Sequence, residues 1–595
     1  MGERIRIDEA PKKRVELRLH TNYSAEDGIL DISEAIRRAK TWGMNALVVT
    51  DHSVVHAFPD AHREVADDPD FKVIYGVEAH FMDDQRDIIV NGQGVVFDEK
   101  QEYVAFYMAT TGYSVKDCRI IGIDAVRMDA SGNEIGCFTR LVNPEVEIPD
   151  YAEELSRITN DMVRDLPTVE SVLPEFLEFA TGAILVTEEN ERVAGFLIRN
   201  CENMNIPCSF AIVYSDFLRP ILFADMDRSE LDMLDYRFGE EFFDTDGPFW
   251  ISKEIASEFR YLLRIMKRKG ISSADEINRM GHEETNYTRY ARVFRGSTIL
   301  VKDEAGLDNL YRLISKYHAA IPMSQIIKNR EGLLLGSGTD LGQLYDALAA
   351  GADDDEIARI IAPFDYLEIQ PFGRVVHPIR TEAQWPGARE EWKKRIKEII
   401  VLGKKYGKPV IAVGDVHFLD PEDAAYQAII HEGYSTPGWD VHDGKKIKIP
   451  VAEGETVLSN EMRRQAPRYF RTTEEMLKEF DFLDPELARE VVIDNPNKIA
   501  DMIQKISPIR RNKVQTDGDT EETCCGSEND GVEDVFCFGL SEPSSEETLL
   551  RFVKEFCERR NVTLSTEEMK EIAQRCQGVR ERKKYKKETW GMKIM

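Results

Sequence analysis

The sequence predicts an α/β protein in which a barrel of alternating strands and helices is interrupted by a second α/β domain. Residues 10–98 alternate short apolar runs with an amphipathic helical pattern, and this alternation returns after residue 270. Polar residues follow directly after several predicted strands, which is where βα barrels keep their chemistry. Between these stretches, residues 99–269 change to a strand meander followed by helices, so we expect an inserted domain there.

In the first stretch the predicted elements are a strand over Arg14–Leu19, a helix over Asp31–Trp42, and strands over Ala46–Thr50 and Lys72–Val77. The helix is assigned because Ile32, Ile36 and Ala39 fall on one face. Each strand runs into polar residues, namely His20, Asp51 with His52, and Glu78.

The second stretch has the same pattern. Its predicted elements are strands over Gly332–Leu335 and Phe364–Ile369, a helix over Glu390–Tyr406 and a strand over Pro409–Val413. The last strand leads directly to Asp415 and His417. If both stretches form one barrel, these two residues lie at the same end as His20 and His52.

Length, composition and net charge indicate a multidomain protein without a membrane span or a signal peptide. The 595 residues are enough for three or four domains, and no run of about 18 uncharged apolar residues predicts a membrane span. The start lacks the apolar core of a signal peptide, and the nine cysteines form no CxxC pair, so we expect reduced thiols and a cytoplasmic location. A net charge of −31 repels nucleic acid, so any DNA contact needs a local basic patch.

The polar residues at the strand ends form a candidate metal site. Imidazoles and carboxylates gathered at one barrel mouth suit a divalent ion such as Zn, Mn or Mg, and such ions can activate water for phosphoester cleavage. Any one of these residues alone is more often a core or surface group, so the hypothesis depends on the combination. The set comprises His20, Asp27, Asp51, His52, Glu78, Asp415 and His417.

Four segments, HTNYSAEDG, VVTDHS, VIYGVEA and VGDVHFLDPED, resemble the PHP domain of PolC-type bacterial DNA polymerase III. The resemblance covers about residues 10–510. It implies a distorted (β/α)7 barrel with up to three metal ions, interrupted by a proofreading exonuclease.

The chain departs from this family where metal ligands are expected. Arg18 takes the first place of the family's His-x-His motif, and Thr339 replaces a cysteine in the segment GSGTD. We expect Arg18, Asp51 and Thr339 to contact the metal ligands without being ligands themselves. We also expect the Arg18 guanidinium to displace an ion. The alternative is that Arg18 points outward and the pocket is merely one ligand short.

The resemblance divides the remaining ligands into sites. Asp27, His52 and His417 would complete one set, whereas His20, Glu78 and Asp415 would form a second set that lacks one ligand. We therefore expect one or two ions at most.

The inserted domain resembles the DEDDh exonucleases, which have an RNase H-like fold and hold two ions on four carboxylates. Their first motif corresponds to FYMATTG, where Tyr107 and Ala109 replace the two acids. Val193 replaces the acid of the second motif, and Asp246 and Ile251 stand where the family has its histidine and last aspartate. Because Ala, Val and Ile offer no oxygen ligand, we expect no 3′–5′ exonuclease activity.

These observations give a domain plan. The barrel comprises residues 1–98 and 270–510, the exonuclease-like insert residues 99–269, an acidic linker residues 511–545, and a helical tail with the basic end RERKKYKK residues 546–595. No segment matches the palm domain of a polymerase, so we expect no polymerase activity.

Three hypotheses about function follow. The first is a binding or scaffold protein of DNA replication or repair, with replication proteins or DNA as partners and no membrane association. The second is a metal-dependent phosphoesterase that uses the remaining metal site. The third is a decaying gene fragment, which the intact strand pattern disfavours.

Overall fold

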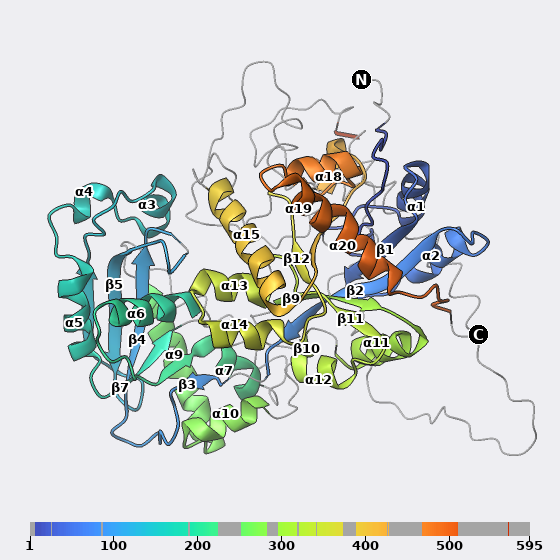
Figure 1. Ribbon diagram of the computed structural model, residues 1–595. Helices are drawn as coiled ribbons and strands as arrows, with labels where there is room; N and C mark the ends of the chain where they lie inside the picture. Colours follow the sequence, from blue (N-terminus) through green and yellow to red (C-terminus); the bar gives the residue numbers. More distant parts are fainter. Residues whose placement is uncertain are drawn as a thin grey trace, which may run out of the picture. The chain divides into compact units, whose positions relative to one another are not determined.

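The computed structural model describes residues 6–24, 27–84, 87–112, 114–187, 191–223, 251–282, 295–317, 320–340, 342–372, 388–424, 426–427, 467–509 and 569–570 (Figure 1). The chain divides into two compact units. The first combines Met1–Gly76 with Val413–Asp481 and Pro485–Met595, and the second combines Val77–Ala412 with Phe482–Asp484. All of the expected linker and nearly all of the expected tail lie outside the described residues.

The first unit is mainly helical around a few parallel segments. Its elements are α1 (Ile32–Thr41), β1 (Ala46–His52), α2 (Phe58–Val65), the start of β2 (Lys72–Met82), η2 (Pro421–Asp423), α18 (Thr473–Glu479), α19 (Pro485–Arg489), η3 (Glu490–Asp494) and α20 (Asn495–Asp501). Helix α1 confirms the expected helix: the Asp31 side chain caps it by accepting from the amides of Ser33 and Glu34, and Ile32, Ala35, Ile36 and Ala39 are buried.

The strand expected over Arg14–Leu19 is wrong. This segment makes only two isolated parallel bridges, Glu16 with Leu47 on one side and Leu19 with Val416 on the other. The reason is that side chains take the amides a ladder would use. The Glu16 carboxylate accepts from the amides of Leu17 and Arg18 at 3.1 Å each, and Thr50 Oγ1 accepts from Leu19 at 2.8 Å.

In the second unit, β3 and five strands of the expected insert build a six-stranded sheet in the order β3-β8-β7-β4-β5-β6 (Figure 1). The strands are β3 (Ile89–Val90), β4 (Glu102–Thr110), β5 (Ile120–Met128), β6 (Glu134–Leu141), β7 (Ala183–Thr187) and β8 (Ile212–Tyr214). The helices are α3 (Asp150–Ser156), α4 (Asn160–Val163), α5 (Val169–Phe179), α6 (Glu191–Asn203), α7 (Ser215–Leu222), α9 (Ile251–Lys269) and α10 (Ala274–His282).

Alternate residues of β4 face opposite sides of this sheet. Tyr103 and Ala105 pack with α7, α9 and α10, whereas Val104 and Phe106 pack with α5 and α6. The sheet is therefore covered by helices on both faces. It includes β3, ahead of residue 99, and one of its cores includes α10, beyond residue 269.

The remaining elements of the second unit are β9 (Arg295–Val301), α11 (Glu304–Lys316), β10 (Ile321–Pro322), α12 (Met323–Lys328), β11 (Leu333–Leu335), α13 (Gln343–Ala350), α14 (Asp354–Ile361), β12 (Leu367–Ile369), α15 (Ala388–Tyr406) and β13 (Val410–Ala412). Strands β2, β9 and β11 are neighbours, and β10 pairs with β2 in parallel. Among the described residues β12 and β13 form a separate two-stranded sheet, so the structure does not show a closed barrel. None of the described helices is both long and apolar enough to cross a membrane.

Candidate metal centre

Three neighbouring parallel segments of the first unit each deliver a histidine. Residues 16–20 lie between β1 and the segment that carries Val416, and the backbone bonds from Thr50 to Leu19 (2.9 Å) and from His20 to Val416 (2.7 Å) fix their register. Parallel segments in register end at the same side of a sheet. Their ends therefore bring together His20, His52 and His417.

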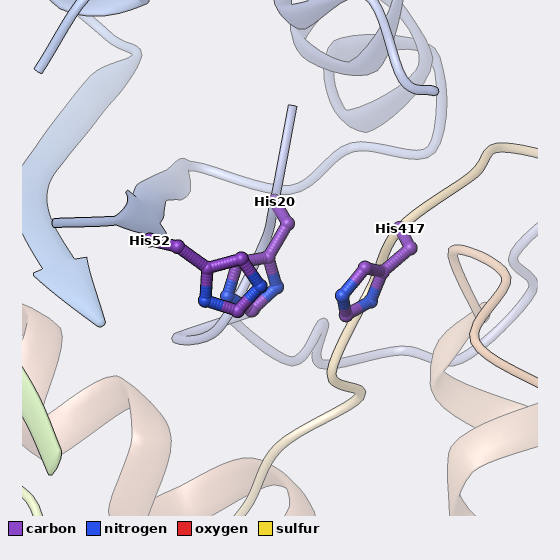
Figure 2. Close-up of side chains that lie close together, drawn as sticks. All are labelled: His20, His52 and His417. Atoms are coloured by element: carbon purple, nitrogen blue, oxygen red, sulfur yellow. The ribbon is translucent and has the colours of Figure 1, made fainter. Parts of the chain in front are cut away.

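The three imidazoles lie close together, with His20 stacked on both His52 and His417 (Figure 2). The ring centroid of His20 lies 4.3 Å from that of His52 and 4.3 Å from that of His417, whereas the outer two are 6.1 Å apart. One nitrogen of each ring lies within 4.8 Å of the others. His20 and His417 are fully buried, so this nitrogen-rich cluster is largely shielded from water.

Asp27 supplies the carboxylate of this cluster. Its Oδ1 lies 3.2 Å from His52 Nε2, and its Oδ2 lies 3.0 Å from His417 Nε2. Burial by itself raises the pKa of Asp27, but His417 and His52 outweigh it by charge and hydrogen bonding and hold that pKa well below its usual range. Gly28 is required here, because a Cβ at this position would lie 1.9 Å from the carbonyl oxygen of Thr21.

Asp51 fixes the loop that carries Asp27. Its carboxylate accepts from the amide of Thr21 at 2.6 Å, from Thr21 Oγ1 at 2.8 Å and from Ser24 Oγ at 2.8 Å. Ser24 Oγ in turn accepts from the amide of His52 at 3.3 Å. Asp51 is fully buried, and this burial raises its pKa. Its oxygens therefore organise the backbone around the cluster.

Arg18 is turned into the protein. Its side chain is fully buried, which excludes the outward orientation, and its Nε lies 3.1 Å from Asp415 Oδ1. His20 Nδ1 lies 3.7 Å from the same oxygen. Asp415 has a φ of +48°, a conformation that costs free energy for a residue with a side chain. A fixed cation therefore lies against a carboxylate expected to bind an ion.

Arg468 also lies at this cluster, although no motif of the sequence indicates it. Its Nη1 lies 3.3 Å from both Asp27 Oδ2 and His417 Nε2, and its Nε lies 3.4 Å from Asp415 Oδ2. The backbone places it there, because its carbonyl accepts from the amide of His417 at 2.8 Å. Unlike the candidate ligands, Arg468 does not follow a predicted strand, and it belongs to none of the quoted motifs. Its position at the cluster is therefore seen only in the fold.

The donor set of Asp27, His52 and His417 fits a divalent ion. His417 Nδ1 donates to the carbonyl oxygen of Asp415 at 2.8 Å, so Nε2 is the nitrogen that would bind an ion after losing its proton. Two imidazoles and one carboxylate are ligands that Zn and Mn accept. When bound, such an ion can lower the pKa of a coordinated water and polarise a phosphoryl oxygen.

Two expected residues belong to the second unit. Glu78, on β2, is buried, and its role as a ligand stays a prediction. Thr339 is also buried, and its Oγ1 donates to Asp340 Oδ1 at 3.1 Å. The role of Thr339 behind the ligands likewise stays a prediction.

Two of the positions expected to correspond to exonuclease acids lie near the end of β4 and in the first turn of α6. Ala109 and Val193 are buried, and Val193 is part of an apolar cluster with residues of β4, α5 and α6. The first turn of α6 reaches β4, since Arg192 Nη1 donates to Thr110 Oγ1 at 3.2 Å. The chain therefore places an apolar side chain at Val193 and a cation beside it.

One acid that we did not predict lies on the sheet near this site. Asp124 stands opposite Tyr107 in the β4–β5 pair and accepts from Thr139 Oγ1 at 2.9 Å and from Ser252 Oγ. Burial raises the pKa of Asp124 despite these hydrogen bonds. Ser252 follows Ile251 at the start of α9, which brings this expected position near Asp124. Asp246 lies outside the described residues.

Two protein families match parts of the chain. The PHP domain family matches residues 16–162, and the exonuclease family RNase_T matches residues 110–242. Among solved structures, Exonuclease X in complex with 5′ overhanging duplex DNA is 19% identical, covers 30% of this chain and 99% of its own, and has a TM-score of 0.22. This likeness supports no conclusion about the present chain.

Curated relatives match most of the chain. The DNA polymerase III PolC-type of Clostridium perfringens is 35% identical over 512 residues, which is 85% of this chain and 33% of the relative. That of Caldanaerobacter subterraneus is 37% identical over 513 residues, 85% of this chain and 34% of the relative, and that of Bacillus subtilis is 33% identical over 527 residues. The chain thus spans about a third of the length of these relatives. This chain is a homologue of PolC-type DNA polymerase III over the region that contains the PHP and exonuclease domains.

Proposed function

We propose that this chain acts by binding, in DNA replication or repair, and that its exonuclease-like domain does not degrade DNA. The observation that carries the proposal is the burial of Ala109 and Val193, two positions at which a two-ion nuclease needs carboxylates. Asp124 stands opposite Tyr107, two residues before Ala109, and its oxygens accept hydrogen bonds from Ser252 and Thr139. Its partners are replication proteins, or DNA contacted through local basic patches.

The proposal includes the architecture expected from the sequence. In it, residues 1–98 and 270–510 form a PHP-type distorted (β/α)7 barrel around an RNase H-like insert of residues 99–269. Residues 511–545 serve as a linker and residues 546–595 as a helical tail. The parallel order of the segments that carry His20, His52 and His417 supports the barrel.

A direct test is a 3′–5′ exonuclease assay of the full chain on 5′-labelled single-stranded DNA with Mg²⁺ or Mn²⁺. An active 3′–5′ exonuclease serves as positive control, and the variant Asp124→Asn as matched control. We expect the wild type and the variant to match the background without protein. Digestion by the wild type that Asp124→Asn abolishes would overturn the proposal.

A second function, a metal-dependent phosphoesterase, is favoured by the convergence of Asp27, His52 and His417. It predicts Mn²⁺- or Zn²⁺-dependent hydrolysis of bis(p-nitrophenyl) phosphate that is lost in His52→Ala. His56→Ala is the matched control, because His56 lies in the loop that follows His52 at the end of β1 and stacks on Tyr23 instead. Equal rates in both variants would exclude this site as the source of the activity.

A further inference from the structure

An arginine side chain, Arg468, contacts both Asp27 and Asp415 at the metal centre. Arg468 lies within 3.4 Å of oxygens of both Asp27 and Asp415, and within 3.3 Å of His417 Nε2. Arg18 lies against Asp415, and His52 and His417 lie against Asp27, whereas Arg468 contacts both carboxylates. The Arg468 side chain is only 17% exposed, which makes this an interior contact.

Arg468 and a divalent ion compete for the same atoms. An ion would bind His417 through Nε2, because Nδ1 faces the carbonyl of Asp415, and Arg468 Nη1 lies 3.3 Å from that Nε2. Asp27 Oδ2 likewise faces both His417 and Arg468. A guanidinium carries only donors and stays protonated, so it cannot share these ligands with an ion.

We propose that Arg468 is a built-in substitute for a metal ion: it neutralises Asp27 and Asp415 in the ion-free protein and must leave before a divalent ion binds. The inference rests on the metal site proposed above. It goes beyond that site by assigning Arg468 control over whether the site is filled.

Isothermal titration of the full, chelator-treated chain with Mn²⁺ tests the proposal, together with thermal unfolding with and without Mn²⁺. The variant is Arg468→Met, and the matched control is Arg489→Met, which removes an arginine of the same unit that is 62% exposed beside Asp494. We expect Arg468→Met to bind Mn²⁺ about tenfold more tightly or better, because the ion no longer displaces a charge-assisted hydrogen bond. Its melting temperature should fall without metal and recover with it.

Each result has a clear meaning. Equal Mn²⁺ affinity in wild type, Arg468→Met and Arg489→Met overturns this inference and leaves the proposed site intact, whereas no binding by any of them overturns both. If Arg468→Met folds only when refolded with Mn²⁺, the substitution of arginine for metal is supported. If it folds under neither condition, Arg468→Lys decides: one ammonium cannot bridge both acids, so an affinity above that of the wild type supports the inference and an unchanged affinity overturns it.

Discussion

The pair between Arg18 and Asp415 gives a quantitative prediction for Arg18→Met. Both side chains are buried, and their closest atoms are 3.1 Å apart. Removing one partner of a buried ion pair costs about 3–5 kcal/mol because it leaves an uncompensated charge. Arg468 stays 3.4 Å from Asp415 and offsets part of this cost, so we expect the lower end, about 3 kcal/mol.

The assay is urea unfolding of the full chain at pH 7, followed by circular dichroism. Arg37→Met is the matched control, because Arg37 is 65% exposed and lies 3.9 Å from Glu64, a geometry worth about 1 kcal/mol or less. If the free energy of unfolding of Arg18→Met lies within about 0.5 kcal/mol of this control, the buried pair does not have the role assigned to it.

Four further changes test other parts of the account. Arg18→His should raise the Mn or Zn content per chain, measured by mass spectrometry, because an imidazole then joins His20 and Asp415; unchanged content contradicts displacement by Arg18. Gly28→Ala should lower the free energy of unfolding by about 1–3 kcal/mol through the Thr21 clash, seen in urea unfolding, and a neutral result contradicts the tight loop. Val193→Asp should lower the free energy of unfolding by about 3 kcal/mol or more, because it buries a charge. Ile198→Asp on the same helix should lower it far less, because Ile198 is 37% exposed. Equal losses in urea unfolding would argue against a buried Val193. In Asp124 the raised folded-state pKa means that the wild type loses stability as the pH rises from the unfolded-state pKa through the folded-state pKa. In urea unfolding, Asp124→Asn should therefore gain stability relative to the wild type as the pH rises above about 4, and a constant difference contradicts the assigned shift.

The sequence predicted the parts of the site that depend on strand order. His20, His52 and His417 each follow an apolar run, and such runs in parallel register end together. Asp27 follows from the family motif, and the clash at Gly28 explains why a glycine comes next to it. Each of these features can be recognised within a single short segment of the sequence.

Features that depend on tertiary contacts could not be predicted. Arg468 belongs to no periodic pattern, and backbone bonds from its segment to His417 and Phe418 place it at the cluster. Asp124 lies in a predicted strand meander. The strand pattern does not indicate that Ser252, which lies on a helix far along the chain, donates a hydrogen bond to it. The strand expected over Arg14–Leu19 is wrong because the Glu16 and Thr50 side chains accept hydrogen bonds from its backbone amides. The spacing of hydrophobic residues cannot predict these side-chain hydrogen bonds.

We propose that Arg18, Arg468, Ala109 and Val193 occupy places where divalent ions would otherwise be held. Native mass spectrometry of the full chain, equilibrated with excess Mn²⁺ after chelator treatment, counts the ions directly. The account predicts at most one ion per chain, held at Asp27, His52 and His417 and lost in His52→Ala. Two or more ions per wild-type chain, or an ion that persists in His52→Ala, would contradict it.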